Sequence, residues 1–172
     1  MAEKVITIFG TARAKPGERI YKLAEQTGKV LAQAGFTIAN GGYGGTMLAA
    51  AKGAAEAGGK IIGVTCSAYK QPANKYVSRE IVASSLDERL DTLIKLGDGY
   101  IVLPGGTGTL LELAMVWELK NKGFLKKNKP VILVGKFWKP LLKLIESDDP
   151  KSIGYLRQVD KPEQIKKLMT DI

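Results

Sequence analysis

The fold of this chain is decided by the stretch YIVLPGGTGTLLE, residues 100–112. Its first four residues are apolar and typical of a buried strand, and residues 109–121 have the pattern of a helix. Between them lies a glycine-rich turn, residues 104–108. Glycines at such a junction let backbone N–H groups approach an anion, and the helix start adds the positive end of its dipole. The stretch therefore predicts a strand, a phosphate-binding loop and a helix.

The same alternation of strand and helix continues on both sides of this unit. The predicted strands are Val5–Phe9, Phe36–Ala39, Lys60–Thr65, Gly99–Leu103 and Val131–Val134, with shorter ones at Glu80–Ala83 and within Ser152–Val159. The predicted helices are Gly17–Ala34, Thr46–Ala57, Leu86–Leu96, Thr109–Asn121, Trp138–Ile145 and Pro162–Met169. Strands that are apolar nearly throughout suit a sheet covered on both faces. We therefore expect one α/β domain over residues 1–172, with a Rossmann-like, doubly wound and mainly parallel sheet and helices on both faces.

Composition narrows the class of protein. The chain has 172 residues, of which 45% are hydrophobic and 25% are charged, as in ordinary soluble domains. It has no membrane-length apolar stretch, begins directly with a strand and carries one cysteine, Cys66, so we expect a cytoplasmic protein with no membrane partner. The absence of histidine excludes the usual hydrolase triads and most zinc sites.

The net charge of +9 favours anionic ligands. Eight lysines and one acid lie between Glu118 and Lys143, which a solvated lysine-rich surface explains more simply than a surface for polyanions. A nucleic-acid partner is the least favoured interpretation, because an aromatic content of 7% leaves little for base stacking.

Glycine-rich loops follow three of the predicted strands, at Gly10-Thr11, at residues 41–45 and at residues 105–108. Because parallel strands end at the same edge of a sheet, we expect the three loops to meet there. Tight turns alone explain each loop, but two such loops at one edge favour a phosphate-bearing ligand. Neither the dinucleotide fingerprint nor a Walker loop has this spacing.

Two charged residues accompany these loops. Thr109 through Glu112 fits a capping box, in which Thr109 caps the helix and the Glu112 carboxylate folds back onto the backbone. The same geometry holds that carboxylate at the mouth of the loop, where it suits a sugar that becomes cationic. Arg89 lies on the helix before the loop's strand, and its acidic neighbours Asp87, Glu88 and Asp91 offer an ordinary ion-pair explanation.

These residues resemble the LOG family, the cytokinin riboside 5′-monophosphate phosphoribohydrolases long mislabelled as lysine decarboxylases. Residues 104–112 fit the family's P-G-G-x-G-T-x-x-E signature, and residues 41–47 are similar to its G-G-G-x-x-G-L-M loop, with Thr46 in place of leucine. Gly10-Thr11 resembles the family's first glycine-serine loop. The family's Met-His-x-Arg-Lys reads Leu-Asp-Glu-Arg-Leu at residues 86–90, without the histidine and lysine.

The resemblance implies a Rossmann-like homodimer that cleaves the N-glycosidic bond of a nucleoside 5′-monophosphate to free base and ribose 5-phosphate. It makes Arg89 and Glu112 the catalytic pair and needs no metal or cofactor. It assigns phosphate and nucleotide contacts to Gly10, Thr11, Gly41, Gly42, Gly44, Gly45, Met47, Pro104, Gly105, Gly106, Thr107, Gly108 and Thr109. Proteins similar to molybdenum-cofactor carriers share the fold, so a non-catalytic carrier of a nucleotide or pterin phosphate is the alternative.

Overall fold

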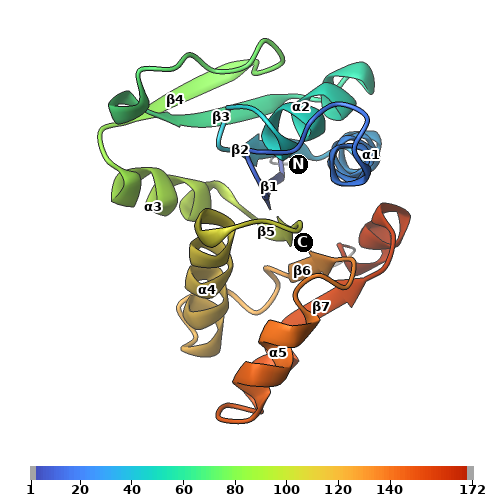
Figure 1. Cartoon of the computed structure of the whole chain (residues 1–172), viewed down its shortest axis with the longest axis vertical. Coiled ribbons are helices and arrows are strands. Elements are labelled where there is room, and N and C mark those ends of the chain that lie inside the picture. The colour runs from blue at the N-terminus through green and yellow to red at the C-terminus, as the bar shows by residue number, and fades with distance from the viewer. Residues whose placement is uncertain (1–2, 170–172) are drawn as a thin grey trace.

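A computed structural model describes residues 3–169 (Figure 1). The strands are β1 (Val5–Phe9), β2 (Thr37–Asn40), β3 (Ile61–Cys66), β4 (Arg79–Ala83), β5 (Gly99–Val102), β6 (Val131–Val134) and β7 (Leu156–Val159). The α-helices are α1 (Arg19–Gln33), α2 (Thr46–Glu56), α3 (Leu86–Leu96), α4 (Thr107–Asn121) and α5 (Lys139–Glu146). The 3₁₀ helices are η1 (Ser67–Tyr69), η2 (Ser152–Tyr155) and η3 (Pro162–Leu168). Within the described residues, no helix combines the length and the apolar character that a membrane span needs.

The strands form one seven-stranded sheet in the order β4-β3-β2-β1-β5-β6-β7, and all neighbouring strands are parallel. From β1 the chain winds outward to β4, and it then returns to the centre and winds outward the other way from β5 to β7. The point of reversal in the sheet therefore lies between the neighbouring strands β1 and β5. In the register of this central pair, Ile6 lies beside Gly99 and Phe9 beside Val102. This is the predicted doubly wound α/β sheet, and a ligand site is expected at the carboxyl ends of β1 and β5.

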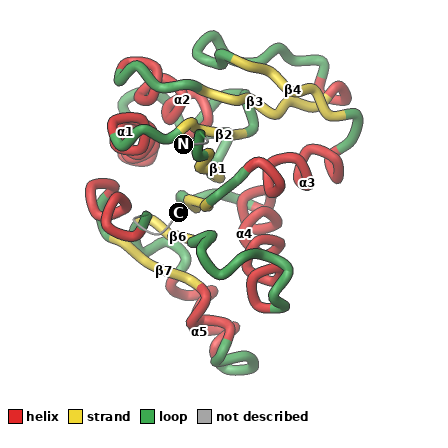
Figure 2. Tube along the Cα trace, turned by 180° about the vertical axis from the view of Figure 1, so that it is seen from behind, coloured by secondary structure: helices red, strands yellow, loops and turns green. Residues whose placement is uncertain are grey.

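Helices cover both faces of the sheet, as Figures 1 and 2 show from opposite sides. Alternate side chains of β1 enter different cores: Ile6 and Ile8 pack with α1, α2 and η3, whereas Phe9 packs with α3, α4 and α5. The central strands β1, β5 and β6 are therefore largely apolar because both of their faces are buried, whereas the edge strands β4 and β7 carry exposed polar residues.

Two glycines let α1 and α2 cross at very short range. A Cβ atom on Gly28 would lie 2.0 Å from the Ala50 carbonyl oxygen, and one on Gly53 would lie 1.9 Å from the Glu25 carbonyl oxygen. Neither position has room for a side chain, so each helix packs a glycine against the backbone of the other. The contact fixes α2, whose first residue follows the second glycine loop.

The structure differs from the predicted elements near the C-terminal end. The short strand predicted within Ser152–Val159 is β7, and the residues before it form η2, because Ser152 turns back onto Asp149 through its backbone N–H and its hydroxyl. The last predicted helix is a 3₁₀ helix that begins with Pro162. The predicted helix at Trp138 begins one residue later, since Trp138 is its N-cap.

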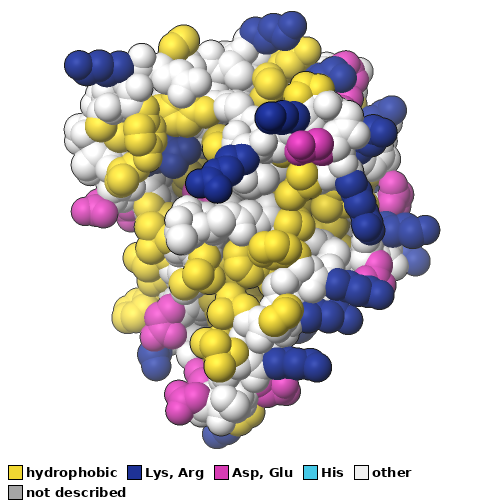
Figure 3. All heavy atoms as spheres, in the orientation of Figure 1, with side chains coloured by type: hydrophobic (Ala, Val, Ile, Leu, Met, Phe, Trp, Pro, Cys, Tyr) yellow, Lys and Arg dark blue, Asp and Glu magenta, His cyan; other side chains and the backbone are white. Residues whose placement is uncertain are grey.

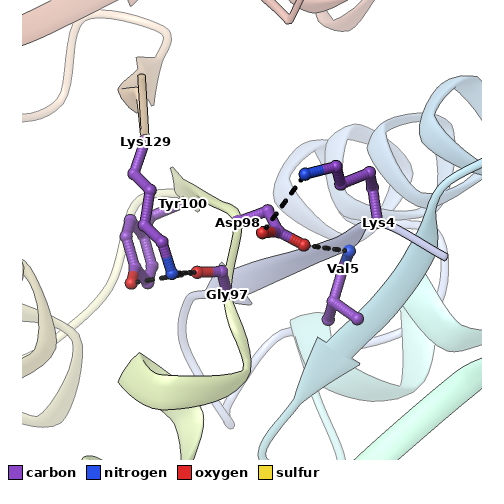
Figure 4. A network of polar contacts seen from close by, with 6 residues as sticks. All are labelled: Lys4, Val5, Gly97, Asp98, Tyr100 and Lys129. Atoms are coloured by element: carbon purple, nitrogen blue, oxygen red, sulfur yellow. Dashed lines mark hydrogen bonds and ion pairs between the residues drawn. The ribbon is translucent and has the colours of Figure 1, made fainter. Parts of the chain in front are cut away.

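A polar network closes the amino edge of the sheet (Figure 4). One Asp98 carboxylate oxygen accepts a hydrogen bond of 3.0 Å from the Val5 backbone N–H, and the other lies 3.8 Å from the Lys4 ammonium group. The Tyr100 hydroxyl donates to the carbonyl oxygen of Ile94 at 2.7 Å, and the Lys129 ammonium group donates to that of Gly97. These bonds join the starts of β1 and β5, the end of α3 and the loop before β6.

Candidate functional site

The three glycine loops meet at the carboxyl edge of the sheet, as predicted. The Thr11 backbone N–H donates to the Pro104 carbonyl oxygen at 3.3 Å. The Thr11 carbonyl oxygen accepts hydrogen bonds from the backbone N–H and the hydroxyl of Thr46, both at 2.9 Å. Gly10 has no room for a side chain, because a Cβ there would lie 2.4 Å from the Thr46 hydroxyl oxygen. The loops after β1, β2 and β5 therefore form one connected surface.

The loop after β2 is shaped by a buried asparagine. The Asn40 side-chain oxygen accepts from the Gly42 N–H at 2.8 Å, and its amide donates to the Met47 carbonyl oxygen at 3.0 Å. Gly45 has a φ of 64°, and a Cβ there would lie 2.4 Å from the Thr11 carbonyl oxygen. Only glycine fits this close approach of two loops.

The loop after β5 leads into α4 without a side-chain cap. The helix begins at Thr107, and its N-cap residue is Gly106, so the prediction that Thr109 caps the helix and Glu112 folds back onto it is wrong. Thr109 instead points down against Gly105, where a Cβ would lie 2.1 Å from its hydroxyl oxygen. Thr107 and its flanking glycines are exposed, so the first turn of the helix presents N–H groups to an anion.

Glu112 lies one turn into α4 and is half-buried. Burial raises the pKa of its carboxyl group from 4.5 to about 7, and the nearby positive charge of Arg89 opposes this rise. Glu112 does not cap the helix, so helix initiation does not explain a carboxyl group at this position. A group with this pKa changes its charge near neutral pH.

Arg89 of α3 is fixed by two backbone oxygens, one from β3 and one from the loop after β2. Its Nε donates to the Val64 carbonyl oxygen at 2.8 Å and its Nη2 to the Gly41 carbonyl oxygen at 3.1 Å, and its guanidinium carbon lies 5.5 Å from the centre of the Tyr43 ring. A Cβ on Gly41 would lie 1.9 Å from Nη2, so a side chain at this position would displace the guanidinium.

The acidic neighbours of Arg89 do not neutralise it. Glu88 accepts hydrogen bonds from Ser84, and Asp91 pairs with Lys95 at 2.6 Å. Among residues 3–169 the ion pairs do not include Arg89, so the expected ion-pair explanation is wrong. Its guanidinium is a half-buried, carboxylate-free cation whose field reaches Glu112.

Three residues that hold the site were not predicted: Asn40, Tyr43 and Asn74. Tyr43 and Asn74 act through contacts between distant segments, and only the Asn-Gly-Gly sequence at residues 40–42 gave a local signal of a turn. Cys66 is buried at the end of β3, as a packing residue would be. The described residues contain no group of three histidine, cysteine or acidic side chains placed to hold a metal ion.

The outer face of α4 is unusually apolar. Leu110, Leu111 and Met115 are exposed there. Beside them a groove of 390 Å³ runs between α4 and α5, with Trp117 and Ile145 among its lining residues. Figure 3 shows apolar side chains gathered over these two helices. The residues that line the groove do not include those of the glycine loops, although Leu110 of the groove lies in α4 directly after the third loop.

The profile of the SLOG cluster4 family matches residues 3–166. The chain belongs to this family. It is 31% identical over 149 residues to a cytokinin riboside 5′-monophosphate phosphoribohydrolase of Rhodococcoides fascians, covering 83% of this chain and 74% of that protein. It is also 34% identical over 119 residues to the protein of that name from Mycobacterium tuberculosis, covering 67% of this chain and 62% of that protein. The resemblance to the LOG phosphoribohydrolases is thereby confirmed.

Solved structures add a second group of similar proteins. The molybdenum cofactor binding protein of Rippkaea orientalis superposes with a TM-score of 0.81 and 27% identity, covering 98% of this chain and 96% of that one. The molybdenum cofactor carrier protein of Chlamydomonas reinhardtii gives a TM-score of 0.74, also with 27% identity, and covers 97% of this chain and 99% of that one. The chain is thus similar both to proteins named phosphoribohydrolases and to molybdenum cofactor binding and carrier proteins.

Proposed function

We propose that this protein hydrolyses the N-glycosidic bond of a nucleoside 5′-monophosphate, with a purine nucleotide of the AMP or cytokinin type as substrate. The observation that carries the proposal is the pairing of Glu112, a carboxyl group with a pKa of about 7, with the uncompensated cation Arg89 beside an open helix start. Relatives named phosphoribohydrolases support it, as do Escherichia coli relatives named pyrimidine/purine nucleotide 5′-monophosphate nucleosidases, 30% identical over 144 residues.

The 5′-phosphate would lie on the N–H groups of residues 105–108. The first turn of α4 has no side-chain cap, so these donors are available to a ligand, and the helix dipole favours its negative charge. The Thr107 hydroxyl, exposed at the same turn, supplies a further donor. Gly41, Gly42, Gly44 and Gly45 line the opposite side, where they keep the backbone close to the ligand.

Glu112 would face the ribose. Hydrolysis breaks the C1′–N bond, the oxygen of water forms the new bond to C1′, and the proton that water loses passes to the departing base. Positive charge grows at C1′ during this step, and an ionised Glu112 stabilises it through the ribose hydroxyls and orients the water. The raised pKa means that the carboxylate is the dominant form only above about pH 7.

Arg89 would stabilise negative charge on the departing base or on the phosphate. Two backbone hydrogen bonds fix its guanidinium, so little reorganisation is needed when charge develops. The histidine and lysine that flank this arginine in the LOG signature are replaced here by Asp87 and Leu90. We therefore expect its choice of base to differ from that of the LOG enzymes.

Incubation of the purified protein with AMP, GMP, CMP and UMP, followed by chromatography of the free bases, tests this function. We expect base release from at least one nucleotide, and loss of that release in the Glu112→Gln variant. Release from none of the four, or undiminished release by the variant, contradicts the proposal.

The alternative is a carrier of a pterin or nucleotide phosphate that does not turn its ligand over. The observation that favours it is the 98% coverage of this chain by the molybdenum cofactor binding protein of Rippkaea orientalis. A carrier uses the same loops and binds mononucleotide or pterin phosphate without forming ribose 5-phosphate. The chromatographic assay, combined with calorimetric titration of the same ligands, separates the two functions.

We further propose a homodimer that works in the cytoplasm. The exposed Leu110, Leu111 and Met115 form a continuous apolar surface with the groove between α4 and α5, and a second copy of the chain would bury it. Sedimentation velocity measures the state of association. A species of 37 kDa, twice the chain mass of 18.5 kDa, is the expected result.

A further inference from the structure

The connection between β3 and β4, residues 67–78, passes beside the candidate site and has no role in the mechanism above. We call it the β3–β4 strap. It leaves β3 through η1 and returns along the sheet to the start of β4 (Figure 1). Tyr69, the last residue of η1, is 50% exposed, whereas Tyr43 beside it is buried. An exposed aromatic ring next to a ligand site calls for an explanation.

The strap is fixed to the second glycine loop by one residue, Asn74. Its backbone N–H donates to the Gly42 carbonyl oxygen at 2.7 Å. Its side-chain amide donates to the same oxygen at 3.1 Å and to the Tyr43 carbonyl oxygen at 2.9 Å. Three hydrogen bonds therefore connect the strap to the second glycine loop. Tyr69 is held in position relative to the site even though its ring is exposed.

Tyr43 connects the strap to Arg89. Its hydroxyl accepts a hydrogen bond of 2.7 Å from the Cys66 N–H and donates to the Cys66 carbonyl oxygen at 3.2 Å, so its buried ring is fixed at the end of β3. The Arg89 guanidinium carbon lies 5.5 Å from the centre of that ring. The Tyr69 ring lies 5.6 Å from the same centre, edge-on at 79°.

We propose that Tyr69 forms the base subsite, by stacking on the planar heteroaromatic ring of the ligand. The inference rests on the proposed function, in which Arg89 lies next to the departing base. Arg89 and Tyr69 both lie against the buried Tyr43 ring, so a base held beside Arg89 would come close to Tyr69. The two tyrosine rings meet at 79° and Tyr69 is half exposed, so part of its ring is open to a ligand. Stacking on an aromatic face tolerates different bases, which suits a site that lacks the LOG family's histidine.

Binding of two ligands tests this subsite: AMP, which has a base, and ribose 5-phosphate, which has none. We expect Tyr69→Ala to weaken AMP binding about tenfold, measured by calorimetry, and to leave ribose 5-phosphate binding unchanged. Tyr69→Phe, which keeps the stacking face, should bind AMP like the wild type. Tyr155→Ala serves as the matched control, because Tyr155 is similarly exposed but lies on η2. Thermal unfolding of all four proteins checks that they are folded.

The outcomes separate this subsite from the proposed hydrolysis. If the wild type releases no base but binds AMP more tightly than ribose 5-phosphate, and Tyr69→Ala removes that difference, the subsite is supported and the hydrolase is not. Unchanged AMP binding by a folded Tyr69→Ala overturns the subsite, as does an equal loss for both ligands. So does a wild-type protein that binds AMP no more tightly than ribose 5-phosphate.

Discussion

The two edges of the central sheet are built from the same strands but treat their polar groups in opposite ways. At the amino edge, Asp98 and Lys129 form hydrogen bonds with backbone groups of the protein itself. At the carboxyl edge, the guanidinium of Arg89 has no carboxylate partner among the described ion pairs, Glu112 is held at a raised pKa, and the start of α4 has no side-chain cap.

This difference indicates that the polar groups of the amino edge stabilise the fold, whereas those of the carboxyl edge destabilise it. The polar contacts at the amino edge join β1 to the residue before β5, and join the loop before β6 to the end of α3. At the opposite edge, an isolated cation and a desolvated carboxyl group lower stability, and a ligand with a phosphate and a sugar would satisfy both. Substitutions at the carboxyl edge should therefore lower activity, whereas substitutions at the amino edge should lower the stability of the fold.

The largest expected effect belongs to the carboxyl edge. Arg89→Met removes the only charge that faces Glu112 in the described site, so we expect base release to fall by a hundredfold or more, about 3 kcal/mol of barrier. Steady-state assays of base release measure it. Arg79→Met, an exposed arginine of β4, is the matched control and should keep its activity. An equal loss in both variants contradicts the assignment of Arg89.

The next effect is on stability and depends on pH. The folded-state pKa of Glu112, about 7, exceeds its ordinary value of 4.5, so the folded protein holds an extra proton between these values. Stability must fall as pH rises from about 4.5 to 7 and then level off. Relative to the wild type, Glu112→Gln should become more stable over this interval, by up to about 3 kcal/mol above pH 7.

Urea unfolding of both proteins at several pH values measures that difference. Glu118→Gln, which removes an exposed carboxylate of the same helix, should show no such rise. A difference between Glu112→Gln and the wild type that is constant from pH 4.5 to 8 would show that Glu112 is not held in its protonated form.

A smaller effect is expected at the amino edge. Asp98→Ala leaves the Val5 N–H without its carboxylate acceptor, so we expect a loss of about 2 kcal/mol of stability and nearly unchanged activity. Asp91→Ala, which breaks an exposed pair with Lys95, should cost well below 1 kcal/mol. Urea unfolding and the base-release assay together check both values. A large loss of activity in a folded Asp98→Ala would show that the two edges are not independent.

The sheet and its loops were predictable because their causes are local. Apolar runs such as Val5–Phe9 and glycines directly after them need only neighbouring residues to be recognised. The meeting of the three loops followed from parallel topology alone. The prediction of a capping box was wrong because the helix begins two residues earlier than expected and the Thr109 hydroxyl group packs against Gly105.

The remaining parts of the site depend on contacts between distant segments. Spacing along α3 offered Asp87, Glu88 and Asp91 as partners of Arg89, whereas the structure gives it two carbonyl oxygens from β3 and the loop after β2. The raised pKa of Glu112 comes from the packing around it rather than from its neighbours in sequence. Asn74 lies in an irregular segment, and no sequence pattern in residues 66–76 indicated its hydrogen bond to the second glycine loop.

The central position of β1 has a consequence for how the protein is made. Its neighbour β2 is synthesised soon after it, but its other neighbour, β5, is synthesised only after α1, α2 and α3. A growing chain on the ribosome therefore carries β1 with one bare edge, which is a hazard for aggregation, until Gly99–Val102 emerges. The docking of β5 covers that edge and also brings Pro104 to Thr11, so protection of β1 and assembly of the pocket are the same event.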